Sequence, residues 1–267
     1  MSAPGAAARV AVVTGASSGI GAETARELAR RGWLCVLVAR RAGRLEALAA
    51  EIGGGAEVEV CDVSDREAVE QVAGRVLARH PAVQLLVNNA GIPARGTFLS
   101  VEPDLVERVL RVNYLGSVWC ARAFLPGLRA AAAAAGGAHV VNVVSVAGTV
   151  SFAPAGAYAA SKHAQLAFSR SLRAALAGSG IRVHTVLPGF AETEGFPQQG
   201  VLRSPLLRAF VIGPDRIARA IVRAVEHGRG EVTVPWFPYR PISLLQALAP
   251  GLMARLVGMS DFRRDAV

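Results

Sequence analysis

A tyrosine and a lysine four residues apart could exchange protons with a ligand. Tyr158 and Lys162 lie in a stretch of helical period, so their side chains share one helix face. Lys162 is the single lysine of the chain, and the other 28 basic residues are arginines. An ammonium about 4 Å from a phenol, at an effective dielectric of about 20, supplies on the order of 4 kcal/mol before desolvation is subtracted. Because this lowers a tyrosine pKa of about 10, the pair predicts a general acid or base. The isolated spacing also occurs on solvated helices.

A serine stands where a strand is expected to end, thirteen residues before the tyrosine. Ser145 follows the β-branched run 140–144. The carboxyl ends of strands face the ligand crevice in open α/β sheets, and a hydroxyl there can hydrogen-bond a substrate carbonyl as charge develops on its oxygen. Ser145 therefore predicts an orienting group for the same site. The alternative is a hydroxyl that caps the end of the strand.

A glycine-rich turn follows the first apolar run. Residues 14–21 have the sequence TGASSGIG and lead into a helical stretch. Glycines at such a turn let the backbone approach a diphosphate, whose charge lies against the N–H groups at the start of the next helix. The position favours dinucleotide binding, although the spacing departs from GxGxxG. The alternative is an ordinary turn between a strand and a helix.

The second expected strand ends on arginines rather than on a carboxylate. Arg40 and Arg41 stand where dinucleotide folds carry an acid for the ribose 2′-hydroxyl. A guanidinium can instead neutralise a 2′-phosphate through its planar fork of donors. The pattern predicts NADP(H) as the preferred cofactor and leaves NAD(H) open. In an arginine-rich chain, the alternative is a pair of solvent-facing side chains.

These residues need a scaffold that brings strand ends and helix starts together. Apolar, β-branched runs alternate with stretches of helical period along the whole chain. Strands are expected at 10–13, 34–38, 58–60, 85–87, 140–144, 183–187 and 232–234. Helices are expected at 20–31, 41–52, 66–79, 104–135, 157–177 and 214–226, the fourth kinked or interrupted at Pro126. The pattern predicts an α/β fold over residues 1–267: a single-domain, doubly wound parallel sheet, Rossmann-like, with about seven strands and helices on both faces.

The composition fits a globular protein and excludes several other classes. With 52% hydrophobic and 18% charged residues, the chain is too apolar for intrinsic disorder. The three cysteines lie singly in apolar stretches, which indicates neither a disulfide framework nor a metal site and suits a reducing compartment. The net charge of +9 comes from scattered arginines, which argues against nucleic-acid binding. No apolar run matches a membrane span and no signal peptide is recognised, so a cytoplasmic location is expected.

Taken together, the motifs resemble those of one known family. They occur in a fixed order at residues 14–21 (TGxxxGxG), Asp62, 88–91 (NNAG), Asn113, Ser145, Tyr158, Lys162 and 188–189 (PG). This order resembles the short-chain dehydrogenase/reductase family, in its compact branch. The resemblance runs from about residue 9 to 234, nearly the whole chain.

The resemblance implies a catalytic tetrad. Tyr158 would exchange the proton, and Ser145 would orient and polarise the carbonyl. Lys162 would hold the nicotinamide ribose and lower the tyrosine pKa. Asn113 would position a water in the proton relay. Neighbouring polar residues are expected to be structural: Asn88 would tie strands together, and His163 faces elsewhere on the helix.

The resemblance also implies where a dinucleotide lies. The diphosphate is expected at the glycine turn, the adenine after the third strand and the nicotinamide beside the PG step. The implied cofactor-binding residues are Gly15, Ser17, Ser18, Gly19, Ile20, Gly21, Arg40, Arg41, Asp62, Val63, Asn89, Ala90, Gly91, Tyr158, Lys162, Pro188, Gly189 and Thr193.

One position departs from the pattern of NADP-preferring members. They often carry a basic residue just before the second glycine of the loop, where this chain has Ser18. The prediction of a 2′-phosphate site therefore rests mainly on Arg40 and Arg41.

Two apolar segments could form the substrate side. In the family the segment after the PG step builds much of the substrate pocket, and here it covers residues 190–213. Its apolar members are Phe190, Phe196, Val201, Leu202, Leu206, Leu207, Phe210, Val211 and Ile212. They predict a lipophilic substrate, such as a steroid, retinoid, fatty-chain or polyketide-like compound. The alternative is that they only fasten the loop to the body.

The apolar C-terminal extension, residues 235–267, has three candidate roles. In order of preference, it covers the pocket, forms a subunit contact or lies in a membrane interface. Met253 and Met259 within it are expected to be packing residues.

The sequence thus predicts an oxidoreductase that transfers a hydride between NADP(H) and a secondary alcohol or ketone. The alternatives are a noncatalytic dinucleotide-sensing protein and an NAD-linked alcohol dehydrogenase. By family analogy the protein is expected to form a homodimer or homotetramer.

Overall fold

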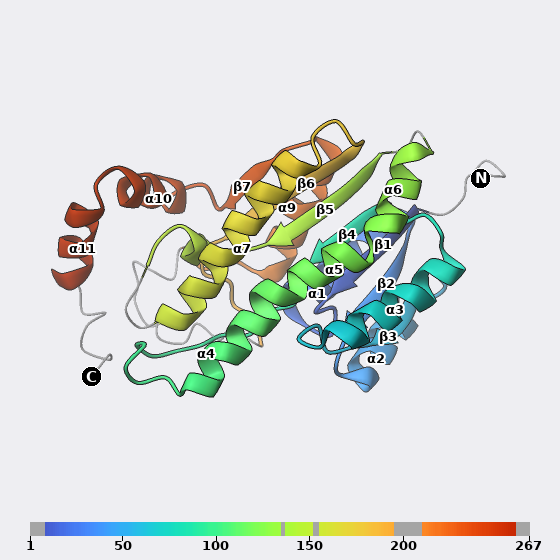
Figure 1. Ribbon diagram of the computed structural model, residues 1–267, viewed down its shortest axis with the longest axis horizontal. Coiled ribbons are helices and arrows are strands. Elements are labelled where there is room, and N and C mark those ends of the chain that lie inside the picture. The colour runs from blue at the N-terminus through green and yellow to red at the C-terminus, as the bar shows by residue number, and fades with distance from the viewer. Residues whose placement is uncertain (1–8, 135–136, 152–154, 195–209, 260–267) are drawn as a thin grey trace.

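A computed structural model describes residues 9–134, 137–151, 155–194 and 210–259 of the chain (Figure 1). Seven strands form one sheet in the order β3-β2-β1-β4-β5-β6-β7, and every neighbouring pair is parallel. The strands are β1 Arg9–Thr14, β2 Trp33–Ala39, β3 Ala56–Val60, β4 Leu85–Asn88, β5 Ala138–Val143, β6 Ile181–Pro188 and β7 Glu231–Val234. The helices are α1 Gly19–Ala29, α2 Ala42–Ile52, α3 Arg66–Arg79, α4 Pro103–Leu110, α5 Gly116–Ala123, α6 Leu125–Ala133, α7 Gly156–Ala175, α9 Pro214–Glu226, α10 Tyr239–Leu248 and α11 Pro250–Met259.

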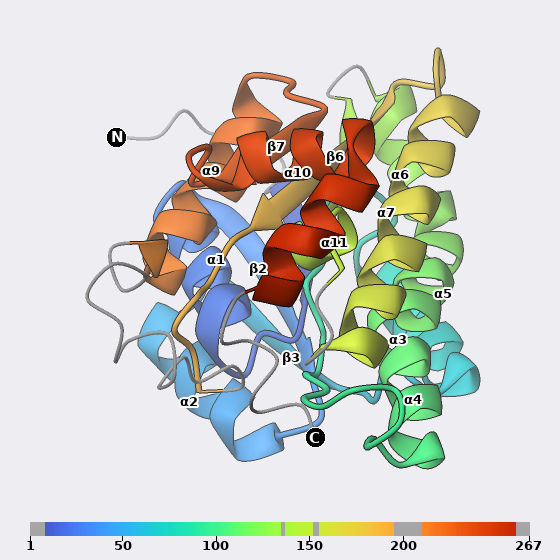
Figure 2. The same cartoon turned by 90° about the vertical axis from the view of Figure 1, so that its left-hand side faces the viewer.

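Helices cover both faces of the sheet, which confirms the predicted doubly wound fold (Figure 2). Helices α1, α2 and α9 pack on one face, against alternate strand residues such as Ala11 and Val13. Helices α3, α5, α6 and α7 pack on the other face, against Val10 and Val12. Both faces of the strands are buried, so the strands are apolar at almost every position. The chain reverses its strand order between β1 and β4, where α/β folds bind ligands.

The long helix expected at 104–135 is divided in the structure. Helix α6 starts at Leu125, so Pro126 lies in its first turn, where the missing N–H costs nothing. A π-helical turn, Arg111–Leu115, joins α4 to α5 and was not anticipated. Strand β5 ends at Val143, one residue earlier than expected, and releases the chain toward Ser145.

The C-terminal helices lie beyond the carboxyl ends of β5 to β7 (Figure 1). Tyr239 and Met253 pack there in a small apolar cluster with Val144, Val146 and Leu187. A Cβ on Gly189 would overlap the Tyr239 ring, so the close approach of α10 to the end of β6 requires glycine. Within the described ranges, no helix has the length and apolar character needed to cross a membrane.

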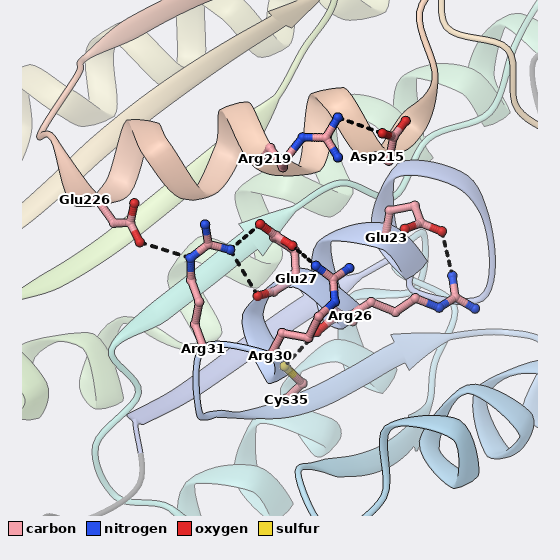
Figure 3. A network of polar contacts seen from close by, with 10 residues as sticks. Glu23, Arg26, Glu27, Arg30, Arg31, Cys35, Asp215, Arg219 and Glu226 are labelled. Atoms are coloured by element: carbon pink, nitrogen blue, oxygen red, sulfur yellow. Dashed lines mark hydrogen bonds and ion pairs between the residues drawn. The ribbon is translucent and has the colours of Figure 1, made fainter.

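An ion-pair cluster joins α1 to α9 on the outside of the sheet (Figure 3). The buried Glu27 carboxylate pairs with Arg30 and Arg31. Arg31 also reaches Glu226 at the end of α9, with 3.1 Å between Nε and Oε1. The hydrogen bond from Arg31 is the largest of the effects that lower the Glu27 pKa. The cluster fixes the helix that begins at the glycine loop.

Candidate active site

The glycine loop after β1 packs against the loop after β4. A Cβ on Gly21 would meet the carbonyl oxygen of Gly15 and lie 2.5 Å from the amide nitrogen of Asn89, so only glycine fits there. The hydroxyl oxygen of Thr14 accepts hydrogen bonds from the N–H groups of Asn89 and Ala90, at 3.0 and 3.1 Å. Asn89 Nδ2 donates to the Thr14 carbonyl at 3.0 Å. The two loops therefore form one rigid edge of the site.

The start of α1 suits a phosphate. Ser18 occupies the position before the helix, but its side chain bonds none of the N–H groups of the first turn. Those groups and the helix dipole attract anions. The Ser18 hydroxyl instead accepts a hydrogen bond from Arg41 Nη2 at 2.6 Å. The sequence TGASSGIG thus leaves the N–H groups of the first turn of α1 without a side-chain cap from Ser18, and anion binding there stays a prediction.

The two arginines after β2 make different contacts. Arg41 Nη2 also donates to Ser17 Oγ at 2.9 Å, which places this guanidinium over the glycine loop. Arg40 Nη1 lies 3.6 Å from Asp62 Oδ2, at the end of β3. Both arginines line the cavity described below. Arg41 therefore lies at the glycine loop, and Arg40 lies beside Asp62.

A carboxylate from a distant segment pairs with the same arginine. Glu194 Oε1 accepts from Arg41 Nη1 at 3.1 Å, and its second oxygen pairs with Arg44. The hydrogen bond from Arg44 is the largest cause of a lowered Glu194 pKa. No local sequence pattern indicates this contact, because more than 150 residues separate its partners.

Ser145 and Tyr158 meet at the carboxyl end of β5. Ser145 Oγ accepts a hydrogen bond from the Ala147 N–H at 3.1 Å and so caps the 3₁₀ turn Val146–Gly148. Its side chain also hydrogen-bonds Tyr158. The capping and orienting roles considered for Ser145 are therefore compatible.

The predicted lowering of the Tyr158 pKa is not observed. Burial raises this pKa to about 12, and the Ser145 hydrogen bond opposes the rise. Lys162 Nζ lies 5.8 Å from the centre of the tyrosine ring and donates to the Val143 carbonyl at 3.1 Å and to Gln165 Oε1 at 2.8 Å. Burial lowers the Lys162 pKa to about 7. The prediction was wrong because the ammonium donates to Val143 and Gln165, and because burial raises the tyrosine pKa by more than the prediction allowed for desolvation.

Asn113 lies in the π-helical turn and is fully buried. Its Oδ1 accepts from the Ile92 N–H at 2.8 Å, and its Nδ2 donates to the Ile92 carbonyl at 3.1 Å and to Ser161 Oγ at 3.0 Å. The side chain thus fixes the loop after β4 and the helix of Tyr158. It is not part of the cavity lining.

One cavity of about 760 Å³ connects the predicted site residues. Its lining contains every residue of the predicted catalytic and cofactor-binding sets except Asn113 and Gly21. It runs from the glycine loop, past Asp62 and Val63, to Ser145 and Tyr158. The uncapped helix start and the close packing at Gly21 fit a dinucleotide diphosphate. Among the described residues, no group of three or more His, Cys, Asp or Glu side chains could hold a metal ion.

The end of the cavity near Tyr158 is largely apolar. Phe190 lines it after β6, and the C-terminal extension adds Tyr239, Ile242 and Met253. The Tyr239 hydroxyl accepts from the Phe190 N–H and donates to the Phe210 carbonyl, both at 3.1 Å, which joins α10 to the substrate-loop segment. Met253 is thus both a packing residue and a lining residue. Five other apolar residues of that segment lie outside the described ranges: Phe196, Val201, Leu202, Leu206 and Leu207.

The neighbouring polar residues are structural, as expected. Asn88 Nδ2 donates to Asn142 Oδ1 at 2.9 Å and so ties β4 to β5. His163 is exposed, and its ring nitrogen contacts the Ala159 carbonyl at 2.8 Å.

This fold and this arrangement of motifs define a class of protein. The sequence model of the family described as "short chain dehydrogenase" matches residues 9–200 of this chain. The chain therefore belongs to the short-chain dehydrogenase/reductase family of oxidoreductases.

Known proteins similar to this chain agree with that membership. It is 39% identical over 249 residues to "Probable oxidoreductase EphD" of Mycobacterium tuberculosis, an alignment that covers 86% of this chain and 40% of that protein. The chain thus spans about two fifths of the length of that relative. A short-chain dehydrogenase/reductase from Burkholderia phymatum in complex with NAD superimposes with a TM-score of 0.81 at 27% identity, over 92% of this chain and 95% of that one. A short-chain dehydrogenase from Burkholderia cenocepacia in complex with NADP superimposes with a TM-score of 0.79 at 29% identity, over 93% of this chain and 97% of that one.

Proposed function

We propose that the protein is an NADP(H)-dependent oxidoreductase that interconverts a lipophilic secondary alcohol and its ketone. The observation that carries the proposal is the shared cavity: Ser145, Tyr158 and Lys162 line the same space as the glycine loop and Arg41. A bound nicotinamide would supply or accept the hydride. The protein would supply orientation, the proton and exclusion of water.

Each catalytic side chain has a role that its contacts support. Ser145 hydrogen-bonds Tyr158, so the two hydroxyls can hold one carbonyl oxygen between them. Tyr158 would deliver the proton to that oxygen during reduction and remove it during oxidation. Lys162 lines the cavity beside Gly91 and would bind the ribose through its ammonium.

Preference for NADP(H) is supported by Arg41. Its guanidinium and the hydroxyls of Ser17 and Ser18 form a donor set at the glycine loop. Such a set suits a 2′-phosphate, because hydroxyls and a guanidinium fork can share its three oxygens. Glu194 supports the second candidate, use of NAD(H), because its carboxylate already pairs with Arg41. The ratio of kcat/KM for NADPH and NADH distinguishes the two.

A lipophilic substrate is supported by the apolar end of the cavity. Phe190, Ile242 and Met253 contribute hydrophobic surface there, and a sugar would leave its hydroxyls unpaired against them.

The proposal includes a cytoplasmic homodimer or homotetramer. Cys35, Cys61 and Cys120 are free and buried, which fits a reducing compartment. Exposed Trp236, Phe237 and Leu248 on the C-terminal extension offer apolar surface for a subunit contact. Size-exclusion chromatography with light scattering measures the assembly directly.

The decisive experiment compares wild type with Tyr158→Phe. NADPH absorbance is followed with a panel of steroid, retinoid, fatty-chain and polyketide-like ketones. We expect turnover of at least one ketone and a loss of about 10²- to 10⁴-fold in the variant, because the proton donor is removed. Turnover that survives the substitution would overturn the proposed role of Tyr158. Binding of NADPH, measured by fluorescence, controls for an intact cofactor site.

A further inference from the structure

The ammonium of Lys162 is held by two neutral acceptors. Lys162 is nearly fully buried, and its Nζ donates to the Val143 carbonyl and to Gln165 Oε1 at 3.1 and 2.8 Å. Burial is the cause of its lowered pKa, and no charged neighbour contributes among the residues that the structure describes. Tyr158 on the same helix is the titratable side chain whose ring lies beside it. The Gln165 amide is therefore the side-chain group that fixes this cation.

Gln165 also connects the lysine to a second element. Its Nε2 donates to Ser117 Oγ on α5 at 2.8 Å, and Ser117 Oγ donates to the backbone carbonyl of Asn113 at 3.2 Å. These bonds form a chain from the ammonium through the amide and the hydroxyl to the π-helical turn. The ammonium, the amide and the hydroxyl are side-chain groups, and the last acceptor is the backbone carbonyl of Asn113.

The burial of Gln165 indicates that its amide has a purpose other than packing. Its exposed fraction is 0%, and both ends of the amide are hydrogen-bonded. An apolar side chain at this position would avoid the desolvation of an amide. A fully satisfied polar network, in contrast, fixes one geometry for all its members. That geometry leaves one of the three ammonium donors of Lys162 to serve the cavity.

We propose that Gln165 is a positioning residue, which holds the Lys162 ammonium toward the cavity and couples it through Ser117 to the Asn113 turn. The inference rests on the proposed role of Lys162 in the reaction. Gln165 itself does not line the cavity and would not touch the cofactor or the substrate.

The single lysine makes the proposal directly measurable. Protein grown with isotope-labelled lysine gives the side-chain NMR signal of Lys162 alone. Its pH titration is compared in wild type, Gln165→Leu and Gln165→Glu, without cofactor. The matched control is Ser169→Ala, which removes another fully buried polar group of α7 that bonds Asn142 and not the lysine.

The two variants are expected to move the titration in opposite directions. Gln165→Leu removes an acceptor that favours the charged form, so the midpoint should fall by about one pKa unit. Gln165→Glu places a carboxylate at the same distance, so the midpoint should rise by at least about one unit. Ser169→Ala should leave the midpoint unchanged. If Gln165→Leu does not fold, the Gln165→Glu titration decides alone.

Kinetics provide a second readout. Gln165→Leu should lower kcat about tenfold or more at neutral pH and shift the pH profile of kcat in the direction of the NMR midpoint, with a smaller effect on substrate KM. A lysine signal that titrates alike in wild type and both variants would overturn the positioning role. That result would leave the Tyr158→Phe comparison unaffected, so the two proposals fail separately.

Discussion

Arg31 beside α1 and Lys162 of α7 lie on opposite faces of the sheet and have opposite environments. Between α1 and α9, the arginines are neutralised by carboxylates: Arg31 pairs with both Glu27 and Glu226 (Figure 3). On the other face, Lys162 of α7 is nearly fully buried, and its hydrogen bonds within the described ranges go to an amide and a carbonyl. The first arrangement keeps its charges at any ordinary pH, whereas the second lets a cation titrate near neutrality.

This difference in environment separates arginines that stabilise the fold from a lysine that can take part in chemistry. A paired arginine is a fixed charge, and it stabilises the position of the helix that begins at the glycine loop. A buried ammonium without a carboxylate can respond to a ligand that brings hydroxyls or negative charge. The use of arginine at every other basic position fits this division, because a guanidinium cannot lose its proton in this range.

The largest effect on activity is expected when the buried lysine is replaced by an arginine. Lys162→Arg replaces the ammonium with a guanidinium. Its planar fork cannot donate to the Val143 carbonyl and Gln165 Oε1 in the same geometry. We expect kcat/KM for ketone reduction to fall by about 10²-fold or more. Steady-state kinetics measure the loss, and circular dichroism checks the fold. Near wild-type activity would show that any cation suffices.

Cofactor choice should respond next. Arg41→Ala removes the guanidinium at the glycine loop, so KM for NADPH should rise about 10- to 100-fold while KM for NADH changes little. Arg40→Ala, whose partner is Asp62, is the matched control and should have the smaller effect. Glu194→Gln removes a competing carboxylate and should tighten NADPH binding a few-fold. If Arg41→Ala raised KM for NADPH and for NADH equally, Arg41 would not be part of a 2′-phosphate site.

A stability effect is expected in the ion-pair cluster. Glu27→Gln leaves Arg31 with weaker partners and should lower the free energy of unfolding by on the order of 1 to 2 kcal/mol at pH 7, measured by urea denaturation. The Glu27 pKa in the folded protein lies below its ordinary 4.5. Its contribution is therefore present above about pH 4.5 and is lost as the pH falls through the lowered value. If the free energy of unfolding of Glu27→Gln fell below pH 4.5 as steeply as that of wild type, the proposed contribution of Glu27 would be contradicted.

The smallest effect is expected at the exposed end of the cluster. Glu226 is about half-exposed, and its pair with Arg31 is solvated. Glu226→Gln should therefore change the free energy of unfolding by less than about 1 kcal/mol, and less again in high salt. If Glu226→Gln lowered the free energy of unfolding as much as Glu27→Gln, burial would not explain the difference between the two carboxylates.

The sequence predicted the parts of the site that depend on local order along the chain. The strands, the glycine loop and the positions of Ser145, Tyr158 and Lys162 follow from hydrophobic periodicity and motif spacing. The resemblance to a family supplied roles that periodicity cannot.

Other features of the site depend on contacts between distant segments. Glu194 reaches Arg41, and Gln165 reaches Ser117, through packing that no local pattern encodes. Tyr239 enters the cavity only because α10 folds back over Gly189. The Tyr158 pKa was mispredicted for the same reason, since desolvation is a property of the assembled fold.

The most direct test of this account is the pH titration of the labelled Lys162 side chain in the wild-type protein. We expect a midpoint near pH 7, because burial lowers the lysine pKa to about 7. A midpoint near the ordinary value of about 10.4 would contradict it, since the cation would then be as permanent as the arginines opposite.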